Sequence, residues 1–306
     1  MTRYQNHAGI HISTNKLQIV EVNSIDNNFI LENVGEEYFS DFFSFEEKET
    51  KLVTILQNAY NEITLRHKLE SSFISFTLPT TVFNIFDIPV EGALTKKDLE
   101  EHINWELSIL VPEIETSSLA VQLIKLNESK LRKSNNLIVI AIKKSILKML
   151  DKFAVRNNMK LRFVDNEHLS ANNILYQQNK FDPASVYITM MVKENYFSLV
   201  LIENKSPVYF TTRMYKSSSE FTDLFKSELK KLSLRLDGDS EINDSYIFGD
   251  YPDLLLENIT KVTGLTFQPV NPFIRIRFGS NVLNSDDIIS QAAKYNSAAG
   301  MAFRLV

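Results

Sequence analysis

Residues 88–112 read IPVEGALTKKDLEEHINWELSILVP, and this stretch contains one well-marked helix. Thr95 suits the N-cap, Asp98 resembles the acid of a capping box, and Pro112 ends the helix. At about 100° per residue the helix carries two apolar stripes. One stripe holds Leu99, Ile103, Leu107 and Leu110, and the other holds His102, Trp105 and Ile109. A helix with two apolar faces is expected to pack against two different surfaces. The second surface belongs either to this protein or to a partner.

Composition excludes several classes of protein. The chain has 306 residues, a net charge of −5 and no cysteine, which excludes disulfides, thiolate zinc sites and cysteine nucleophiles. The acidic balance gives no reason to expect nucleic acid as a partner. The longest continuous apolar run, 137–142, is far too short to cross a membrane. We therefore expect a cytoplasmic protein that reaches a membrane only through a partner.

Hydrophobic periodicity divides the chain into two halves and an insert. The first half is expected to have strands at 8–13, 16–22, 29–39 and 72–78 and a helix at 46–67. The insert is expected to have the order βαββαβ, with strands at 82–88, 119–126, 137–142 and 160–164 and helices at 96–111 and 144–157. A helix at 166–178 leads back, and the second half is expected to have strands at 186–192, 196–202, 208–214, 245–249 and 265–270 and helices at 218–236, 254–263 and 288–303.

Both halves thus begin with three strands followed by a helix. This organisation is typical of the actin-like (ribonuclease H-like) α/β fold, in which two halves enclose a cleft whose strand turns can hold nucleotide phosphates. We expect a first half of 1–81 plus 165–181, an inserted α+β subdomain at 82–164, and a second half at 182–306.

Motifs of common enzymes are missing from the sequence. It has no Walker A sequence, no G-x-G-x-x-G, no H-E-x-x-H and no G-x-S-x-G. The five histidines are scattered, so we expect no metal site, and we identify no catalytic residue.

Five segments, in order along the chain, resemble the PilM family of type IV pilus assembly proteins. The residues that carry the resemblance are Gly9–Val22, then Leu99, Ile103, Trp105, Glu106 and Pro112, then Val164 and Asp165, then Asn271–Phe273, and finally Ser297–Arg304. The cytoplasmic domain of the type II secretion L protein shares much of this pattern and stays an alternative.

The cleft signature of the resemblance is incomplete. The actin-like pattern has an aspartate and a glycine where this sequence has His11 and Ser13, and an acid where it has Met191. The candidate cofactor-binding residues of this degenerate cleft are His11, Ser13, Thr14, Asn15, Lys193, Gly249 and Asp250. We expect no cofactor and no enzymatic activity. The alternative is an ATP- and magnesium-binding switch or ATPase in which Glu194 or Asp250 replaces the missing acid.

The resemblance also implies a partner, the cytoplasmic N-terminal tail of a bitopic inner-membrane protein (PilN in that family). The tail would lie in a groove between the insert and the first half, and the candidate lining residues are Phe83, Ile85, Phe86, His102 and Trp105. We expect Phe86 to face outward near this groove, whereas core packing is the favoured interpretation for Trp105.

The phenylalanines at 39, 42, 43 and 45 cover the sheet or form an exposed apolar patch. The function expected overall is a non-catalytic cytoplasmic scaffold of a pilus or secretion platform, held at the inner membrane by its partner. Self-assembly stays open.

Overall fold

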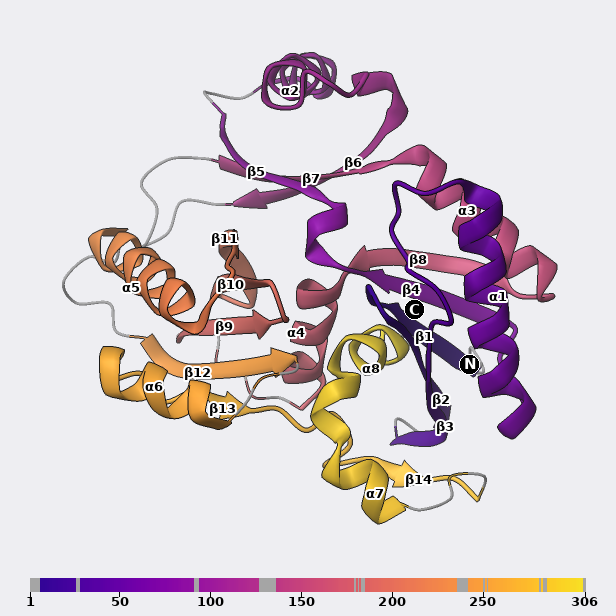
Figure 1. Cartoon of the computed structure of the whole chain (residues 1–306). Helices are drawn as coiled ribbons and strands as arrows, with labels where there is room; N and C mark the ends of the chain where they lie inside the picture. The colour runs from indigo at the N-terminus through magenta and orange to yellow at the C-terminus, as the bar shows by residue number, and fades with distance from the viewer. Residues whose placement is uncertain are drawn as a thin grey trace.

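The computed structural model describes residues 6–25, 28–90, 94–126, 136–178, 180, 182, 185–235, 242–249, 251, 253–280, 282 and 285–304. Two large sheets lie on either side of a central pair of helices, and a smaller sheet with its own helix lies above them (Figure 1). Asp250, one of the candidate cofactor residues, lies outside the described residues.

The first sheet has the order β14-β3-β2-β1-β4-β8. Its strands are β1 (His7–Ile12), β2 (Lys16–Ile25), β3 (Asn28–Tyr38), β4 (Phe73–Leu78), β8 (Lys160–Asn166) and β14 (Arg277–Phe278). Helices α1 (Glu49–Arg66) and α3 (Lys144–Arg156) cover one face. The opposite face carries α4 (Glu167–Gln177) and α8 (Asn296–Ala302).

Two segments expected in the insert pack with the first sheet instead. Strand β8 pairs with β4 in parallel. Helix α3 buries Phe153 against Tyr60 of α1 and Phe76 of β4, at ring distances of 5.6 and 5.9 Å. This strand and helix therefore pack with the first half, although the expected insert, 82–164, includes them. How many units fold independently stays a prediction.

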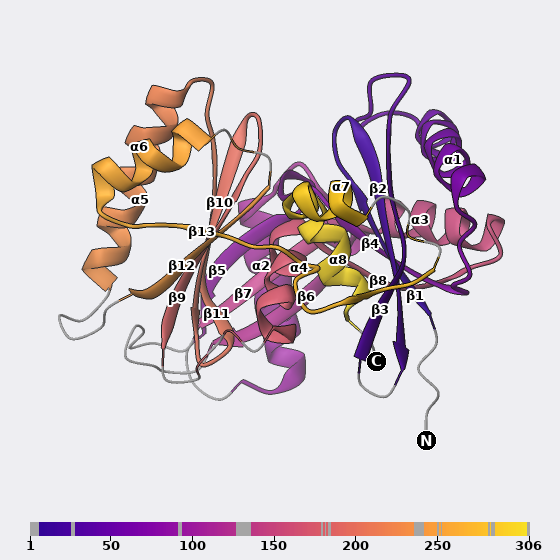
Figure 2. The ribbon, with the colours of Figure 1, turned by 90° about the horizontal axis from the view of Figure 1, so that it is seen from below.

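The second sheet has the order β11-β10-β9-β12-β13. Its strands are β9 (Val186–Val192), β10 (Tyr196–Glu203), β11 (Ser206–Met214), β12 (Ile242–Gly249) and β13 (Gln268–Pro269). Helices α5 (Ser218–Arg235) and α6 (Asp253–Thr263) cover its outer face (Figure 2). The strand expected at 265–270 is reduced to two residues.

The insert contains a three-stranded sheet, β5-β7-β6, and one helix. Its elements are β5 (Asn84–Pro89), α2 (Lys96–Leu110), β6 (Leu119–Leu126) and β7 (Asn136–Lys143), with short 3₁₀ helices at Thr80–Val82 and Thr116–Ser118. The helix begins as predicted, since Thr95 Oγ1 accepts the backbone N–H of Asp98 at 3.2 Å. Ile103 and Leu107 of its first stripe are buried against the sheet.

The last helix of the chain is interrupted, whereas one continuous helix was expected at 288–303. It divides into α7 (Ser285–Ser290), a 3₁₀ turn at Ala292–Tyr295 and α8. In the described part of the chain, no helix combines the length and apolar composition needed to cross a bilayer.

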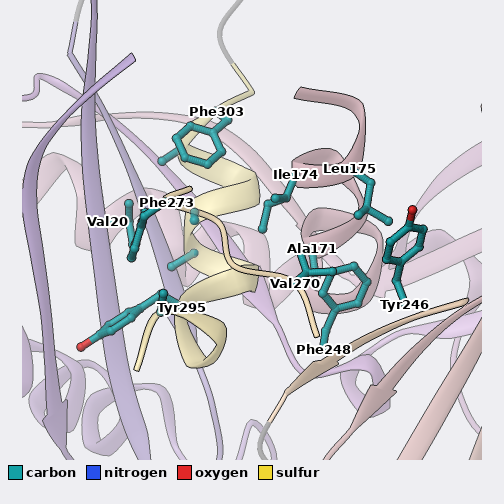
Figure 3. Close-up of a cluster of buried hydrophobic side chains, with 14 of the residues drawn as sticks. Val20, Ala171, Ile174, Leu175, Tyr246, Phe248, Val270, Phe273, Tyr295 and Phe303 are labelled. Atoms are coloured by element: carbon teal, nitrogen blue, oxygen red, sulfur yellow. The ribbon is translucent and has the colours of Figure 1, made fainter. Parts of the chain in front are cut away.

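Helices α4 and α8 join the two halves. Figure 3 shows Ala171, Ile174 and Leu175 of α4 beside Phe248 and Tyr246 of the second sheet, with Phe303 and Val20 on the other side. A Cβ on Gly300 would lie 1.9 Å from the carbonyl oxygen of Ser170, so glycine lets the two helix backbones touch. The Ser170 hydroxyl donates to the Ser297 carbonyl at 2.9 Å in the same contact.

We expect Gly300→Ala to lower the free energy of unfolding by about 1–3 kcal/mol, because its methyl group has no space between the two backbones. Urea denaturation measures the change. Gly264→Asn is the matched control: no atom lies within 4 Å of a Cβ there, and asparagine tolerates the positive φ, so we expect a change within about 0.5 kcal/mol. Equal midpoints for Gly300→Ala and wild type would contradict the close helix contact.

Candidate functional site

A cleft of about 1610 Å³ opens between the two halves. Two hairpin turns contribute to its wall, the β1–β2 turn at Ser13–Asn15 and the β9–β10 turn at 193–195. The N-terminus of α4 also reaches the cleft through Glu167. Two hairpin turns and a helix N-terminus suit an anion. Their backbone N–H groups can donate to it, and the positive end of the helix dipole attracts it.

The carboxylate of Glu167 occupies this position. Its Oε2 lies 3.1 Å from Lys193 Nζ of the second half and 3.0 Å from His11 Nε2 of the first half. Its Oε1 accepts the Thr80 backbone N–H at 3.1 Å and the Tyr196 hydroxyl. We call Glu167, His11, Lys193, Tyr196 and the Thr80 amide the Glu167 network. The network connects both halves through one carboxylate.

The charge of Glu167 is held in place by its partners. Burial alone would raise the pKa of this carboxyl, but Lys193 and the hydrogen bonds from His11 and Tyr196 hold it well below its usual range. The same burial, together with the negative charge of Glu167, raises the pKa of Tyr196 well above its ordinary value, so its hydroxyl stays a donor. At the centre of the network the Glu167 carboxylate is therefore ionised, and both of its oxygens already accept hydrogen bonds or ion pairs from other residues.

The network continues through the first sheet. His11 is hydrogen-bonded through Nδ1 to Gln18 Oε1 at 3.1 Å, and Gln18 Nε2 donates to Glu36 at 3.0 Å. Glu36 in turn pairs with Lys16 and with Lys294 near the start of α8. A line of polar contacts thus runs from the second half to the segment that precedes α8.

Both hairpin turns are hydrogen-bonded to other groups of the protein. The Ser13 hydroxyl oxygen accepts the backbone N–H groups of Asn15 and Lys16 at 3.3 and 3.0 Å. The Tyr215 hydroxyl donates to the Lys193 carbonyl in the opposite turn. Two backbone N–H groups of the first turn therefore already donate to the Ser13 hydroxyl, so they are less available to donate to a phosphate.

The structure brings together four of the candidate cofactor residues. Ser13, Thr14, Asn15 and Lys193 all line the cleft, whereas His11 is buried behind the turn. Gly249 is not part of the cleft lining. It lies at the end of β12 with φ of +99°, where a Cβ would be 2.1 Å from the Val192 carbonyl oxygen.

Glu167 is the central residue of the site, and sequence reasoning missed it. An acid in the first turn of a helix reads as an ordinary favourable interaction with the helix dipole. Its partners come from positions far away in the chain, so no local signal identifies them. Among the described residues, no group of three acidic or histidine side chains could hold a metal ion.

A second set of cleft-lining residues comes from the first half and the insert, and we call this part of the cleft the groove. Its walls are the loop at 42–46, residues 113–118 and the start of α3. Apolar side chains on these walls include Phe42, which is 68% exposed, and the half-buried Val82 and Ile114. The phenylalanines before α1 therefore do both things considered from the sequence: Phe43 is buried against the sheet while Phe42 faces outward.

The five candidate partner residues do not form one surface. Phe83 and Ile85 lie on the face of the insert sheet that packs against Phe210 of β11. Phe86 packs under α2 with the insert core, so the prediction that it faces outward is wrong. Strand β5 is covered on both faces, which the alternation of its residues did not reveal.

Core packing is also the wrong interpretation for Trp105, because this side chain is 59% exposed. Ile103 and Leu107 fill the contact with the insert sheet, and Trp105 lies between them in sequence on another side of the helix. The His102 ring stacks beside the indole at a centroid distance of 6.4 Å.

Comparison with solved structures identifies the fold class as actin-like. A structure described as a PilM-PilN type IV pilus biogenesis complex is 15% identical, with a TM-score of 0.81 over 99% of this chain and 98% of that one. A Bacteroides thetaiotaomicron protein with an actin-like ATPase fold is 14% identical, with a TM-score of 0.58 over 98% and 96%. The cytoplasmic domain of EpsL from the Vibrio cholerae type II secretion system is 7% identical, with a TM-score of 0.51 over 94% of each chain.

The family follows from the sequence itself. The model of the type IV pilus assembly protein PilM family matches residues 9–226, and the chain belongs to this family. No curated protein sequence matches the chain.

We expect Glu167→Gln to lower the free energy of unfolding by about 2–3 kcal/mol at neutral pH, because it removes the buried negative charge that Lys193 and the hydrogen-bond donors of the network contact. The folded pKa of Glu167 is depressed, so its contribution is present above about pH 4.5 and is lost as the pH falls below that value. The difference between variant and wild type in urea denaturation should therefore shrink in acid.

Glu194→Gln is the control, since Glu194 lines the same cleft but is exposed. We expect it to change stability by less than about 0.5 kcal/mol. A Glu167→Gln protein as stable as this control would show that the network does not join the halves.

Proposed function

We propose that this chain is a non-catalytic scaffold of a type IV pilus assembly platform, and that it binds the cytoplasmic N-terminal tail of a bitopic inner-membrane protein of the PilN kind. The observation that carries the proposal is the division of the cleft. Glu167 fills the end where an anion would bind, and the groove between loop 42–46 and the insert stays open.

The electrostatics of the cleft support the absence of catalysis. A triphosphate seated between the two turns would meet the Glu167 carboxylate and would have to take Lys193 from it. Breaking a buried ion pair in this way is costly, because the remaining charge loses its partner. The buried Met191 also leaves no acid at that position of the second sheet. The cleft therefore favours its own internal pairing over a cofactor.

The groove supports a peptide as the ligand. Apolar side chains line its walls, and two lysines on its rim already have partners, with Lys143 on Glu46 at 3.1 Å and Lys144 on the Ser117 carbonyl at 2.8 Å. A largely apolar extended tail fits such a preformed groove. A solved structure with this fold is described as a PilM-PilN complex, which supports a partner of this class. Such a tail would hold the protein at the cytoplasmic side of the inner membrane.

The groove predicts which side chains bind the tail. We expect Phe42→Ala and Ile114→Ala each to weaken binding of the PilN-like protein's N-terminal peptide about tenfold in calorimetry, because each removes apolar contact area. Leu65→Ala is the control, since Leu65 is 79% exposed on α1 away from the groove. Full affinity in both groove variants would place the tail elsewhere.

A second candidate function is an ATP-dependent switch, and the exposed Glu194 in the cleft is the acid it would need. The scaffold proposal predicts that Mg-ATP binds the wild-type protein more weakly than about 1 mM in calorimetry, because Glu167 holds Lys193. Micromolar binding that is lost in Glu194→Gln would favour the switch.

A further inference from the structure

Helix α2 presents an apolar ridge to solvent on the side away from its own sheet. Trp105 is 59% exposed and Ile109, one turn later, is 55% exposed. Figure 1 places α2 at the outer end of the insert. The ridge is separate from the groove of the proposed function, since neither residue lines the cleft. Exposed apolar side chains that adjoin on one helix face are typical of a docking surface.

The ridge lies on an acidic helix. Helix α2 carries four acids, Asp98, Glu100, Glu101 and Glu106, against two lysines, Lys96 and Lys97. Glu101 lies one turn before Trp105, and Glu106 follows it directly. Both lysines lie in the first turn of α2, at 4.0 and 3.7 Å from Glu100 and Glu101.

The negative charge of α2 indicates which kind of partner would bind the apolar ridge. A second copy docked on the same face would bring two acidic rims together, and an anionic membrane surface would repel the rim. A cationic partner would instead be attracted by these acidic side chains. Trp105 and Ile109 are one helical turn apart, which matches the side-chain ridges of another helix.

We propose that the Trp105–Ile109 ridge, with Glu101 and Glu106 beside it, docks a cationic amphipathic helix of a second partner protein. The stacked His102 ring supports the indole on one side, so Trp105 is preorganised as the anchor. This surface is independent of the groove, and it would let one scaffold hold two components at once.

Trp105 is the only tryptophan in the chain, so its fluorescence reports on the ridge directly. The probe is a short leucine–lysine amphipathic peptide, and a leucine–glutamate peptide of the same pattern is its control. We expect the cationic peptide to shift the Trp105 emission to shorter wavelength and to protect it from acrylamide, with an affinity that falls as salt rises.

Charge-reversal variants test the role of the rim. Glu101→Lys combined with Glu106→Lys should weaken binding at least about tenfold. Glu62→Lys combined with Asp151→Lys makes the same net change on exposed positions of α1 and α3 and should have little effect. In calorimetry, Trp105→Ala should lose binding while Trp105→Phe retains most of it.

Three results would overturn the proposal. One is unchanged emission with the cationic peptide, another is equal binding by both charge-reversal pairs, and the third is a concentration-dependent dimer that buries Trp105. Phe42→Ala, in the groove, should leave binding to the ridge intact. Failure of the ridge is thereby distinguished from failure of the proposed tail binding.

Discussion

A buried carboxylate links the two halves of this protein, beside the apolar contacts of α4 and α8. Glu167 contacts His11 of the first sheet, Lys193 and Tyr196 of the second, and the Thr80 amide that precedes the insert. Its neighbour His168 adds a second link, since its ring is hydrogen-bonded to Ser198 and Thr189 of the second sheet at 2.7 and 3.0 Å. Burial lowers the pKa of His168 to about 3, so this link is neutral. In a fold whose halves enclose a cleft, these contacts take the place that a bound anion could fill.

The same region explains why the end of the chain belongs to the core of the molecule. Helix α8 lies between β1 and α4, where a Cβ on Gly9 would be 2.1 Å from the Ala298 carbonyl oxygen. Arg304 just beyond α8 pairs with Asp165 at 2.7 Å. Residues from three segments that carry the family resemblance therefore meet in one contact. Their shared role is structural, because they hold α8 against the first sheet.

Local patterns predicted most of the elements and the fold class. The cap at Thr95, the burial of Ile103 and Leu107 on α2 and the hairpin at the start of each half are set by neighbours in sequence, and the structure confirms them, whereas Leu110 of the same stripe is 43% exposed. The Glu167 network was not predictable in this way, because its members are brought together only by tertiary contacts, as with His11 and Glu167, 156 positions apart. The predicted exposures of Trp105 and Phe86 were wrong for a related reason. Whether a side chain is exposed depends on what covers that face of its helix or strand, which local sequence does not show.

The central claim of the proposed function is that Glu167 closes the part of the cleft between the two hairpin turns to a nucleotide. A crystal structure of the protein grown with millimolar Mg-ATP tests it most directly. The account predicts that the Glu167 carboxylate stays in contact with Lys193 and that no nucleotide lies between the two hairpin turns. Phosphates seated between those turns, with Glu167 displaced from Lys193, would contradict it.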